Sequence, residues 1–194
     1  MEIGLLVLIV ILGAALAAVV YAVMIYNNLV QVKHNVTKAW ANIDVLLKQR
    51  HDELPKLVDA CREYMKFEQD TLSRVIDARA KVFSASQSQN MPALGAAEGE
   101  LRAGLGKLFA LAEAYPDLKT NQSFQQLQGR ISSLENGIAD RREFYNESVN
   151  VNNVRIEQFP DVLVAGRFGF KPFALLEFEA AEKADVNVGQ LFKP

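Results

Sequence analysis

The sequence predicts an all-α protein in which an N-terminal transmembrane helix continues into an elongated antiparallel helical bundle. Residues 3–25 contain no charged side chain and consist mainly of Leu, Ile, Val and Ala. The 194 residues include only 11 glycines and 6 prolines, which favours long helices over a turn-rich β fold. Further along, apolar residues recur at spacings of three and four, the period of a helix with one buried face. We expect a transmembrane anchor at 1–26, a bundle of about four helices at 27–160 and a short, non-helical, aromatic tail at 161–194.

The apolar N-terminal segment is long enough to cross a bilayer. At about 1.5 Å per residue, residues 3–25 form a helix of roughly 34 Å, and the hydrocarbon core is about 30 Å thick. A cleaved secretory signal is the alternative, but such a signal begins with basic residues and ends at small ones. This segment begins with Glu2, and its apolar run ends at Tyr26 and Asn27. We therefore expect an uncleaved anchor, with Tyr21 and Tyr26 at the level of the lipid headgroups.

Small residues lie one helical turn apart within this segment, Gly13 with Ala17 and Ala14 with Ala18. Small residues at this spacing let two helices approach closely in lipid. The spacing is compatible with self-association of the span, and equally with the ordinary alanine content of a membrane helix.

Basic residues predict the orientation of the anchor. Only Glu2 precedes the span, whereas Lys33, Lys38, Lys48 and Arg50 follow it. Because basic residues favour the cytoplasmic side, we expect the N-terminus outside and the bundle in the cytoplasm.

The first bundle helix is expected to continue from the span, because neither glycine nor proline separates them. Its apolar stripe consists of Leu29, Val32, Val36, Trp40, Ile43 and Leu47. We interpret Trp40 as a core residue, and Asp44 and Arg50 as members of surface and inter-helix ion pairs. Pro55 disfavours an uninterrupted helix, so we favour a turn at 51–55 in which Asp52 caps the next helix. A kink in one very long helix is the alternative.

Two further helices are expected before residue 115. The apolar face of the second consists of Leu54, Val58, Cys61, Met65, Leu72, Val75, Arg79 and Val82. It fades into the polar residues 84–90, which we expect to form the main flexible loop. The third helix, at about 92–114, is expected to be the least stable, because it contains four glycines that each cost up to about 1 kcal/mol. Cys61, the only cysteine, is interpreted as a buried structural thiol.

The last helix has the most regular pattern. Its stripe extends over five heptads and consists of Phe124, Leu127, Ile131, Leu134, Ile138, Arg141, Tyr145, Val149, Asn152, Ile156 and Phe159. This spacing is typical of a long coiled-coil-like helix. Arg141 and Asn152 interrupt the stripe, and we expect them to tune the helix register or to meet partners within the bundle.

The tail is rich in phenylalanine, with Phe168, Phe170, Phe173 and Phe178. Such a tail can clasp the bundle, lie on the membrane surface or bind a neighbouring subunit. The sequence leaves these three interpretations open.

Two stretches of the chain resemble the LemA family of bacterial membrane proteins. The first runs from Tyr26-Asn27-Asn28-Leu29-Val30 through Ala39-Trp40 and Ile43-Asp44 to Leu54-Pro55-Lys56-Leu57-Val58, and the second contains Tyr145-Asn146, Val149, Asn153, Ile156, Phe159-Pro160 and Phe168-Gly169-Phe170. Their order, their spacing and the preceding span agree over nearly the whole chain. In one departure, Asn152-Asn153 replaces a second Tyr-Asn pair of the family pattern, which removes an aromatic contact from the last helix.

The resemblance implies a single-span protein of the bacterial inner membrane with a helical, largely cytoplasmic body. It implies no established enzymatic activity and no catalytic residue that could be transferred to this chain. Some members of the family are associated with membrane shaping or envelope organisation.

The residues themselves indicate no catalytic, metal or nucleic-acid site. With 21 basic and 23 acidic side chains, the net charge is −2 and there is no basic stripe for nucleic acid. His34 and His51 lie too far apart on a helix to share a metal, and no glycine-rich phosphate loop follows a strand. We therefore expect a protein that is not an enzyme and that uses no metal or other cofactor.

Two classes of function remain in addition to the disfavoured enzyme. The first is a membrane-anchored scaffold that contacts the lipid bilayer and forms a homo-oligomer. The second is an adaptor that recruits a cytoplasmic protein partner through its bundle or tail.

Overall fold

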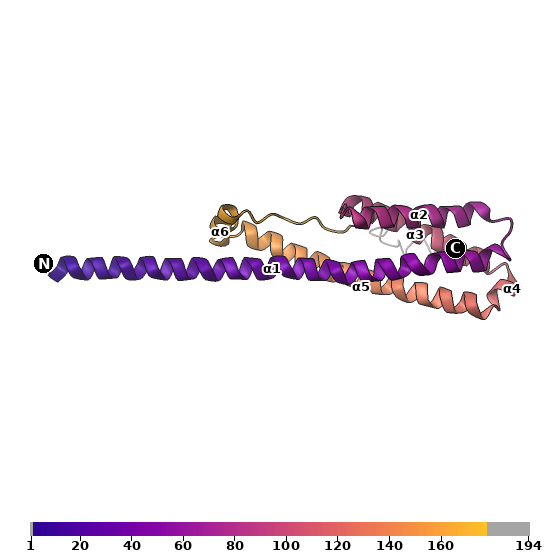
Figure 1. Cartoon of the computed structure of the whole chain (residues 1–194), viewed down its shortest axis with the longest axis horizontal. Helices are drawn as coiled ribbons and strands as arrows, with labels where there is room; N and C mark the ends of the chain where they lie inside the picture. The colour runs from indigo at the N-terminus through magenta and orange to yellow at the C-terminus, as the bar shows by residue number, and fades with distance from the viewer. Residues whose placement is uncertain (1, 178–194) are drawn as a thin grey trace, which may run out of the picture. The chain divides into compact units, whose positions relative to one another are not determined.

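A computed structural model describes residues 2–177, and within them the chain is helical, with turns and one extended segment but no strand. The helices are α1 (Glu2–Arg62), α2 (Gln69–Gln87), α3 (Met91–Ala112), α4 (Pro116–Lys119), α5 (Gln122–Glu157) and α6 (Asp161–Phe168), as labelled in Figure 1. α1, α2, α3 and α5 are the long helices, so the expected all-α fold with about four main helices is confirmed. The described residues divide into two compact units, one of residues 2–41 and 143–175 and the other of residues 42–142 and 176–177.

In the first unit, α1 begins as an exposed apolar helix. Every described side chain before Ile25 is exposed, and Ile25 is the first buried residue. Among residues 2–177, α1 is the one helix that is long and apolar enough to cross a membrane. The exposed apolar side chains suit lipid as their surroundings far better than water.

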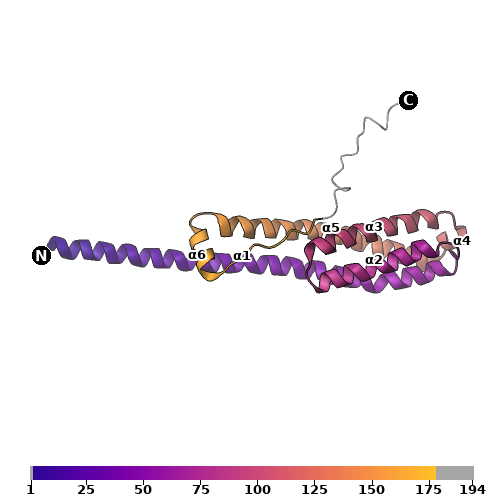
Figure 2. The same cartoon turned by 90° about the horizontal axis from the view of Figure 1, so that it is seen from above.

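The packed part of this unit is an antiparallel pair of α1 and α5, joined by α6. The rings of Trp40 and Tyr145 are 6.0 Å apart, and Leu29 shares a buried cluster with Ile156. Leu29 precedes Trp40 by eleven residues in α1, and Ile156 follows Tyr145 by eleven residues in α5. The two helices are therefore antiparallel. Ala165 of α6 joins the cluster beside Ile25. Figure 2 shows α6 next to α1 where α5 ends.

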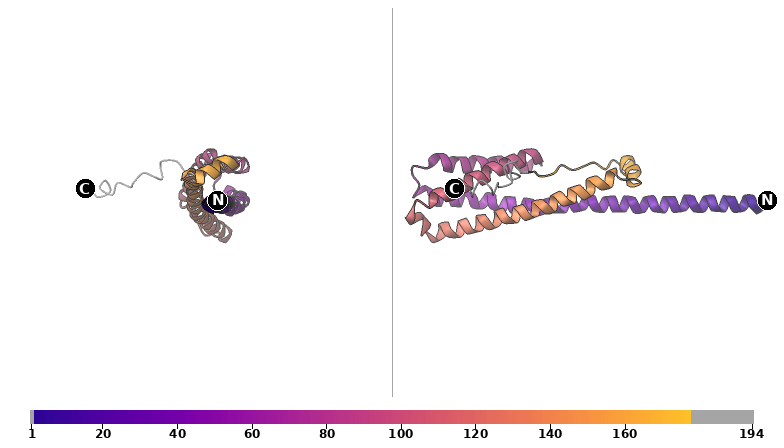
Figure 3. Two further views of the ribbon diagram at one scale, coloured as in Figure 1. Left: turned by 90° about the vertical axis from the view of Figure 1, so that its left-hand side faces the viewer. Right: turned by 180° about the vertical axis from the view of Figure 1, so that it is seen from behind.

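The second unit is a four-helix bundle. α2 and α3 lie side by side, next to the part of α1 from residue 42 and the first part of α5 (Figures 2 and 3). Its core contains Ile43, Leu54, Leu57, Cys61, Met65, Leu72, Val75, Leu94, Leu101, Leu108 and Ile131. Side chains of this size contribute about 1.5–3 kcal/mol each on full burial. α3 is fully formed despite its glycines, and a Cβ at Gly104 would lie only 3.3 Å from Val75 Cγ2, so that glycine permits close packing with α2.

The turn expected at 51–55 is wrong, because α1 continues through Pro55 to Arg62. Pro55 has no N–H with which to donate to the carbonyl of His51, one turn earlier. Arg79 of α2 fills this gap, since its Nε donates to that carbonyl oxygen at 2.8 Å. Beyond the proline, Leu57 and Cys61 are fully buried, and their burial favours continuation of the helix.

The flexible loop expected at 84–90 is also wrong in its extent. α2 continues to Gln87, and only residues 88–90 connect it to α3. Asn90 ends the connection by capping α3, with its side-chain oxygen accepting from the N–H of Ala93 at 3.2 Å. Gln89 adopts a φ of 50°, which lets the chain reverse within so few residues.

The C-terminal tail differs from the expected non-helical segment in its first part. Residues 161–168 form α6, because Asp161 and Ala165 are buried within the first unit. Gly169, with a φ of 72°, ends this helix in the left-handed conformation that glycine adopts without strain. Residues 169–177 are non-helical as expected, and Phe178 lies outside the described residues.

The role of Arg79 predicts a specific coupling between two helices. We expect Arg79→Met to lower the free energy of unfolding by about 1–3 kcal/mol, because it leaves the His51 carbonyl without a donor. In a Pro55→Ala background the restored N–H supplies that donor, so the same substitution should cost clearly less. Thermal and denaturant unfolding of the four proteins in detergent, followed by circular dichroism, measures the coupling. Equal costs of Arg79→Met in both backgrounds would show that Arg79 does not compensate for the proline.

Cys61 is predicted to be inert towards thiol reagents in the folded protein. Burial raises the pKa of its thiol to about 11, so at about pH 8 only roughly one molecule in a thousand carries the reactive thiolate. We expect negligible maleimide labelling of the native protein and complete labelling after denaturation, as measured by mass spectrometry. A Ser84→Cys variant, whose new thiol lies at an exposed position, should be labelled within minutes and serves as the control.

Candidate functional site

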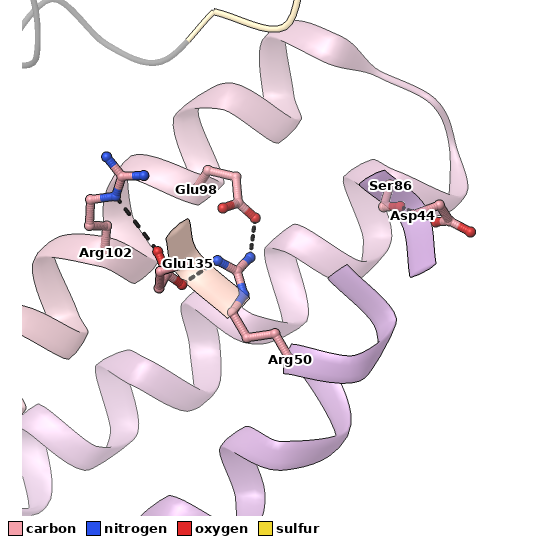
Figure 4. A network of polar contacts seen from close by, with 6 residues as sticks. All are labelled: Asp44, Arg50, Ser86, Glu98, Arg102 and Glu135. Atoms are coloured by element: carbon pink, nitrogen blue, oxygen red, sulfur yellow. Dashed lines mark hydrogen bonds and ion pairs between the residues drawn. The ribbon is translucent and has the colours of Figure 1, made fainter. Parts of the chain in front are cut away.

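The most strongly desolvated polar group in the described chain is Arg50. Its side chain is 1 % exposed and projects from α1 into the four-helix bundle. One guanidinium nitrogen donates to Glu98 of α3, and the other donates to Glu135 of α5 (Figure 4). Arg102 Nε lies 3.7 Å from the second oxygen of Glu135. Three helices therefore meet at one cation.

The electrostatics of this cluster favour a permanently charged arginine. Burial by itself would lower the pKa of Arg50, but the carboxylates of Glu98 and Glu135 outweigh it and raise the pKa above its ordinary value. Glu98 is 3 % exposed, so water has little access to the pair. A buried charge with two partners is costly to unpair, and its partners specify how the helices are aligned. The cluster therefore acts as a structural clamp.

Arg79 forms a second polar cluster close to the first. Besides the His51 carbonyl, it contacts His51 Nε2 through Nη2 at 2.7 Å, and the His51 ring stacks on Phe83 with centroids 4.5 Å apart. Burial first, and then the positive charge of Arg79, lower the pKa of His51 and favour its neutral form. On the other side, Ser86 Oγ donates to Asp44 at 2.9 Å and ties α2 to α1.

The space between the two clusters is small. The cavity between them has a volume of about 10 Å³, which is room for one water molecule. Within residues 2–177 there is no group of three or more His, Cys, Asp or Glu side chains that could hold a metal ion.

Polar side chains of α5 fix the extended segment that follows α6. Asn153 donates from Nδ2 to the carbonyl of Phe173 at 3.0 Å and accepts from its N–H at 3.0 Å, so one amide satisfies both backbone groups. The Tyr145 hydroxyl donates to the carbonyl of Ala174 at 2.9 Å, and buried Asn152 donates weakly to that of Lys171 at 3.5 Å. This segment, residues 171–174, clasps α5 as a strap.

The structure separates the remaining candidate residues into packed and exposed ones. Trp40 packs on Tyr145 but is only half-buried, and Tyr26 contacts Phe168 and Phe170 at 4.9 and 5.8 Å between ring centroids. Arg141 does not lie on the buried stripe, because its side chain is exposed while Ile138 and Tyr145 are buried. Phe159 is also exposed, since it follows the end of α5. The exposed residues of the span include Tyr21 and the small residues Gly13, Ala14, Ala17 and Ala18.

The sequence interpretation named Arg50 but not its partners, and it gave no contact to Asn153. Arg50 was expected in surface and inter-helix ion pairs, and its partners are Glu98 and Glu135 on other helices. A signal for Glu98 was present, because it lies between Leu94 and Leu101 at helical spacing and therefore on the buried face of α3. Asn153 carried no such signal, since only the fold brings Phe173 opposite to it.

The Arg50 cluster predicts a large penalty for losing the cation. Arg50→Met should destabilise the protein by about 3–5 kcal/mol, because it leaves the buried Glu98 carboxylate unpaired and leaves Glu135 with Arg102 alone. Replacing Glu98 and Glu135 by Gln in the same variant should recover most of that loss. Denaturant unfolding in detergent tests both statements. If the single variant is as stable as the original protein, the clamp does not exist.

Comparison with known proteins agrees with this architecture. The model of the LemA family matches residues 39–189, most of the chain. Protein LemA of Metamycoplasma hominis is 27% identical over 166 residues, which cover 85% of this chain and 74% of the relative. Magnetosome protein MamQ 2 of Paramagnetospirillum magneticum is 22% identical, covering 93% of this chain and 75% of the relative. Magnetosome protein MamQ of Magnetospirillum gryphiswaldense is also 22% identical, covering 88% and 71%.

The family match covers α1 from residue 39 onwards, all of α2 to α6 and the strap. It therefore includes Arg50, both of its partners and the Asn153 contacts. The relatives fit a membrane-associated helical protein, as does the exposed apolar start of α1. On the family match over residues 39–189, this chain belongs to the LemA family.

Proposed function

We propose that this protein is a non-catalytic, membrane-anchored helical scaffold that self-associates and serves membrane shaping or envelope organisation. In this proposal α1 crosses the bacterial inner membrane, with the N-terminus outside and the bundle in the cytoplasm. The observation that carries it is an exposed apolar stripe on α5, in the same compact unit as the exposed apolar segment of α1.

The stripe consists of Phe144, Val151 and Val154, whose side chains are 57%, 41% and 50% exposed. Their spacings of seven and three place them on one face of α5. The other face of the helix is already occupied, since Tyr145 and Val149 are buried. An apolar face left open on a helix that is otherwise packed favours a protein partner.

A second copy of the same chain is the partner that the anchor favours. Proteins held in one membrane are confined to a thin layer, which raises their effective concentration for each other. The span offers a second contact surface, because Gly13 and Ala17 are exposed and a Cβ at Gly13 would meet nothing within 4 Å.

Continuity between the span and the packed helix explains how assembly would act on the bilayer. Within the first unit, α1 passes from its exposed apolar part into contact with α5 and α6 without a break in the helix. A tilt imposed on the packed part by a neighbouring copy is then transmitted to the lipid-facing part. Many copies side by side would bend or organise the membrane.

An adaptor that recruits a cytoplasmic protein is the second candidate function, and the same α5 stripe favours it. In that case the stripe is covered by a different protein, and the purified chain stays monomeric.

The scaffold proposal predicts that the α5 stripe controls self-association. In liposomes, full-length proteins carrying donor and acceptor dyes should show energy transfer that decreases on lipid dilution. The double substitution Phe144→Ser/Val151→Ser should weaken association about tenfold or more, because it removes two apolar contacts. Phe67→Ser is the matched control, since Phe67 is a fully exposed phenylalanine outside the stripe.

The contribution of the span is separable in the same assay. Gly13→Leu should reduce energy transfer, whereas Gly4→Leu lies on the opposite side of the helix, nine residues away, and should not. A Cβ at either position meets nothing within 4 Å, and the neighbouring side chains of the span are exposed, so we expect the fold to be preserved in both variants. Absence of energy transfer in the unsubstituted protein would exclude the scaffold and favour the adaptor.

A further inference from the structure

Exposed phenylalanine and leucine side chains lie on α6 and just before it, and α6 packs on α1 where α1 first becomes buried. The inner side of α6 packs on Ile25 and Leu29 through Ala165 and Val164. Three other apolar side chains here are largely exposed, Phe159 at 79%, Leu163 at 65% and Phe168 at 62%, although the Phe168 ring also contacts Tyr26 of α1. We call these three residues, together with α6, the collar.

The collar lies at the level where the span ends. Ile25 is the last residue of the apolar segment 3–25 and also the first buried one, so α6 touches the end of the span itself. From Ile25 to Leu29 the helix rises by about 6 Å, and the headgroup region on each side of a bilayer is of similar thickness. Tyr26 contacts Phe168 and Phe170 at the same level. A tyrosine at this level is typical of a membrane interface, where its ring faces the acyl chains and its hydroxyl the headgroups.

A basic groove opens beside the collar. It has a volume of about 530 Å³, and its walls include Tyr26, Lys33, His34, Phe168 and Lys171. No Asp or Glu contributes to the described walls, and neither lysine forms an ion pair with a described residue. Lys33 comes from α1, whereas Lys171 is held by the strap that Asn153 fixes. The groove therefore places two free ammonium groups beside aromatic rings.

We propose that the collar inserts into the interface of the bilayer and that Lys33 and Lys171 bind the phosphate of an anionic phospholipid headgroup in that leaflet. The exposed apolar side chains bury their surface at the boundary of the acyl chains, as amphipathic interfacial helices do. The two ammonium groups then meet the negative charge of the leaflet. This proposal rests on membrane insertion of α1 and is independent of self-association.

Lipid explains the combination of features better than a second protein does. The apolar rings adjoin the span directly, so any occupant has to fit at headgroup level. The neighbouring free charges are positive, which suits an anionic leaflet. One carboxylate nearby, Asp161, is already paired with Arg155 at 2.7 Å and does not oppose such a surface.

Site-specific fluorescence tests the position of the collar. Full-length Leu163→Cys protein is labelled with the environment-sensitive dye NBD and reconstituted in nanodiscs of phosphatidylcholine and phosphatidylglycerol. Cys61 is left in place because its buried, protonated thiol does not react. We expect a blue-shifted emission, several-fold brighter than in detergent-free buffer, that lipids with doxyl groups near the headgroup quench. The same dye on Phe67→Cys, at an exposed position in the α1–α2 connection, should give the emission of a dye in water.

A label at Leu12→Cys reports separately whether α1 is in the membrane, since Leu12 lies within the span. If the Leu12 label is in lipid while the Leu163 label matches the Phe67 control, the collar proposal is overturned and the anchor survives. If the Leu12 label is in water, both are overturned. Energy transfer between copies plays no part in this measurement, so its loss would affect only the scaffold proposal.

Lipid selectivity tests the groove. Electron paramagnetic resonance of spin-labelled phosphatidylglycerol and phosphatidylcholine gives their relative association constants with the full-length protein. We expect the protein to prefer phosphatidylglycerol. In the double variant Lys33→Gln/Lys171→Gln, the ratio of the two association constants should fall by about fivefold for each lysine removed. The matched double variant Lys66→Gln/Lys107→Gln removes the same charge at exposed positions outside the groove and should keep the preference. A preference that is absent, or unchanged by Lys33→Gln/Lys171→Gln, overturns the headgroup site.

Discussion

The carbonyl of His51 is the point on which the length of α1 depends. Pro55 deprives it of its normal donor, and a helix would ordinarily end there. Arg79 reaches across from α2 and donates to that oxygen, so α1 continues and buries Leu57 and Cys61 in the four-helix bundle. Both sides of this arrangement are needed, because α2 can supply the arginine only once it is packed on α1. The helix and its neighbour therefore form together.

The Arg50 cluster applies the same logic to three helices. Arg50 is fixed between Glu98 and Glu135, and the two carboxylates come from α3 and α5. Apolar side chains of similar size could fill the same space in several registers, whereas a buried cation is satisfied in only one. Together with the Ser86 contact to Asp44, this gives the bundle a defined alignment.

In the unit that carries the apolar start of α1, the polar contacts have a different role. Amide groups of Asn152 and Asn153 hold the strap by its backbone, and the strap in turn carries Lys171 to the edge of the groove. Together these contacts place an aromatic and basic surface beside the end of the span.

The sequence by itself determined the all-α class, the apolar span, the stripes of the long helices and the family resemblance, because each is written in local composition and in periods of three and four. It also indicated that Trp40 is a packing residue. Only the tertiary structure decided that α1 passes through Pro55, that residues 84–90 are mostly helical, that the tail begins with α6 and that Arg141 is exposed. The physical reason is the same in these cases. Local propensities consider a proline or a polar run together with its neighbours in sequence alone. The local structure depends instead on contacts with residues distant in sequence, such as Arg79 with His51 and Asn153 with Phe173.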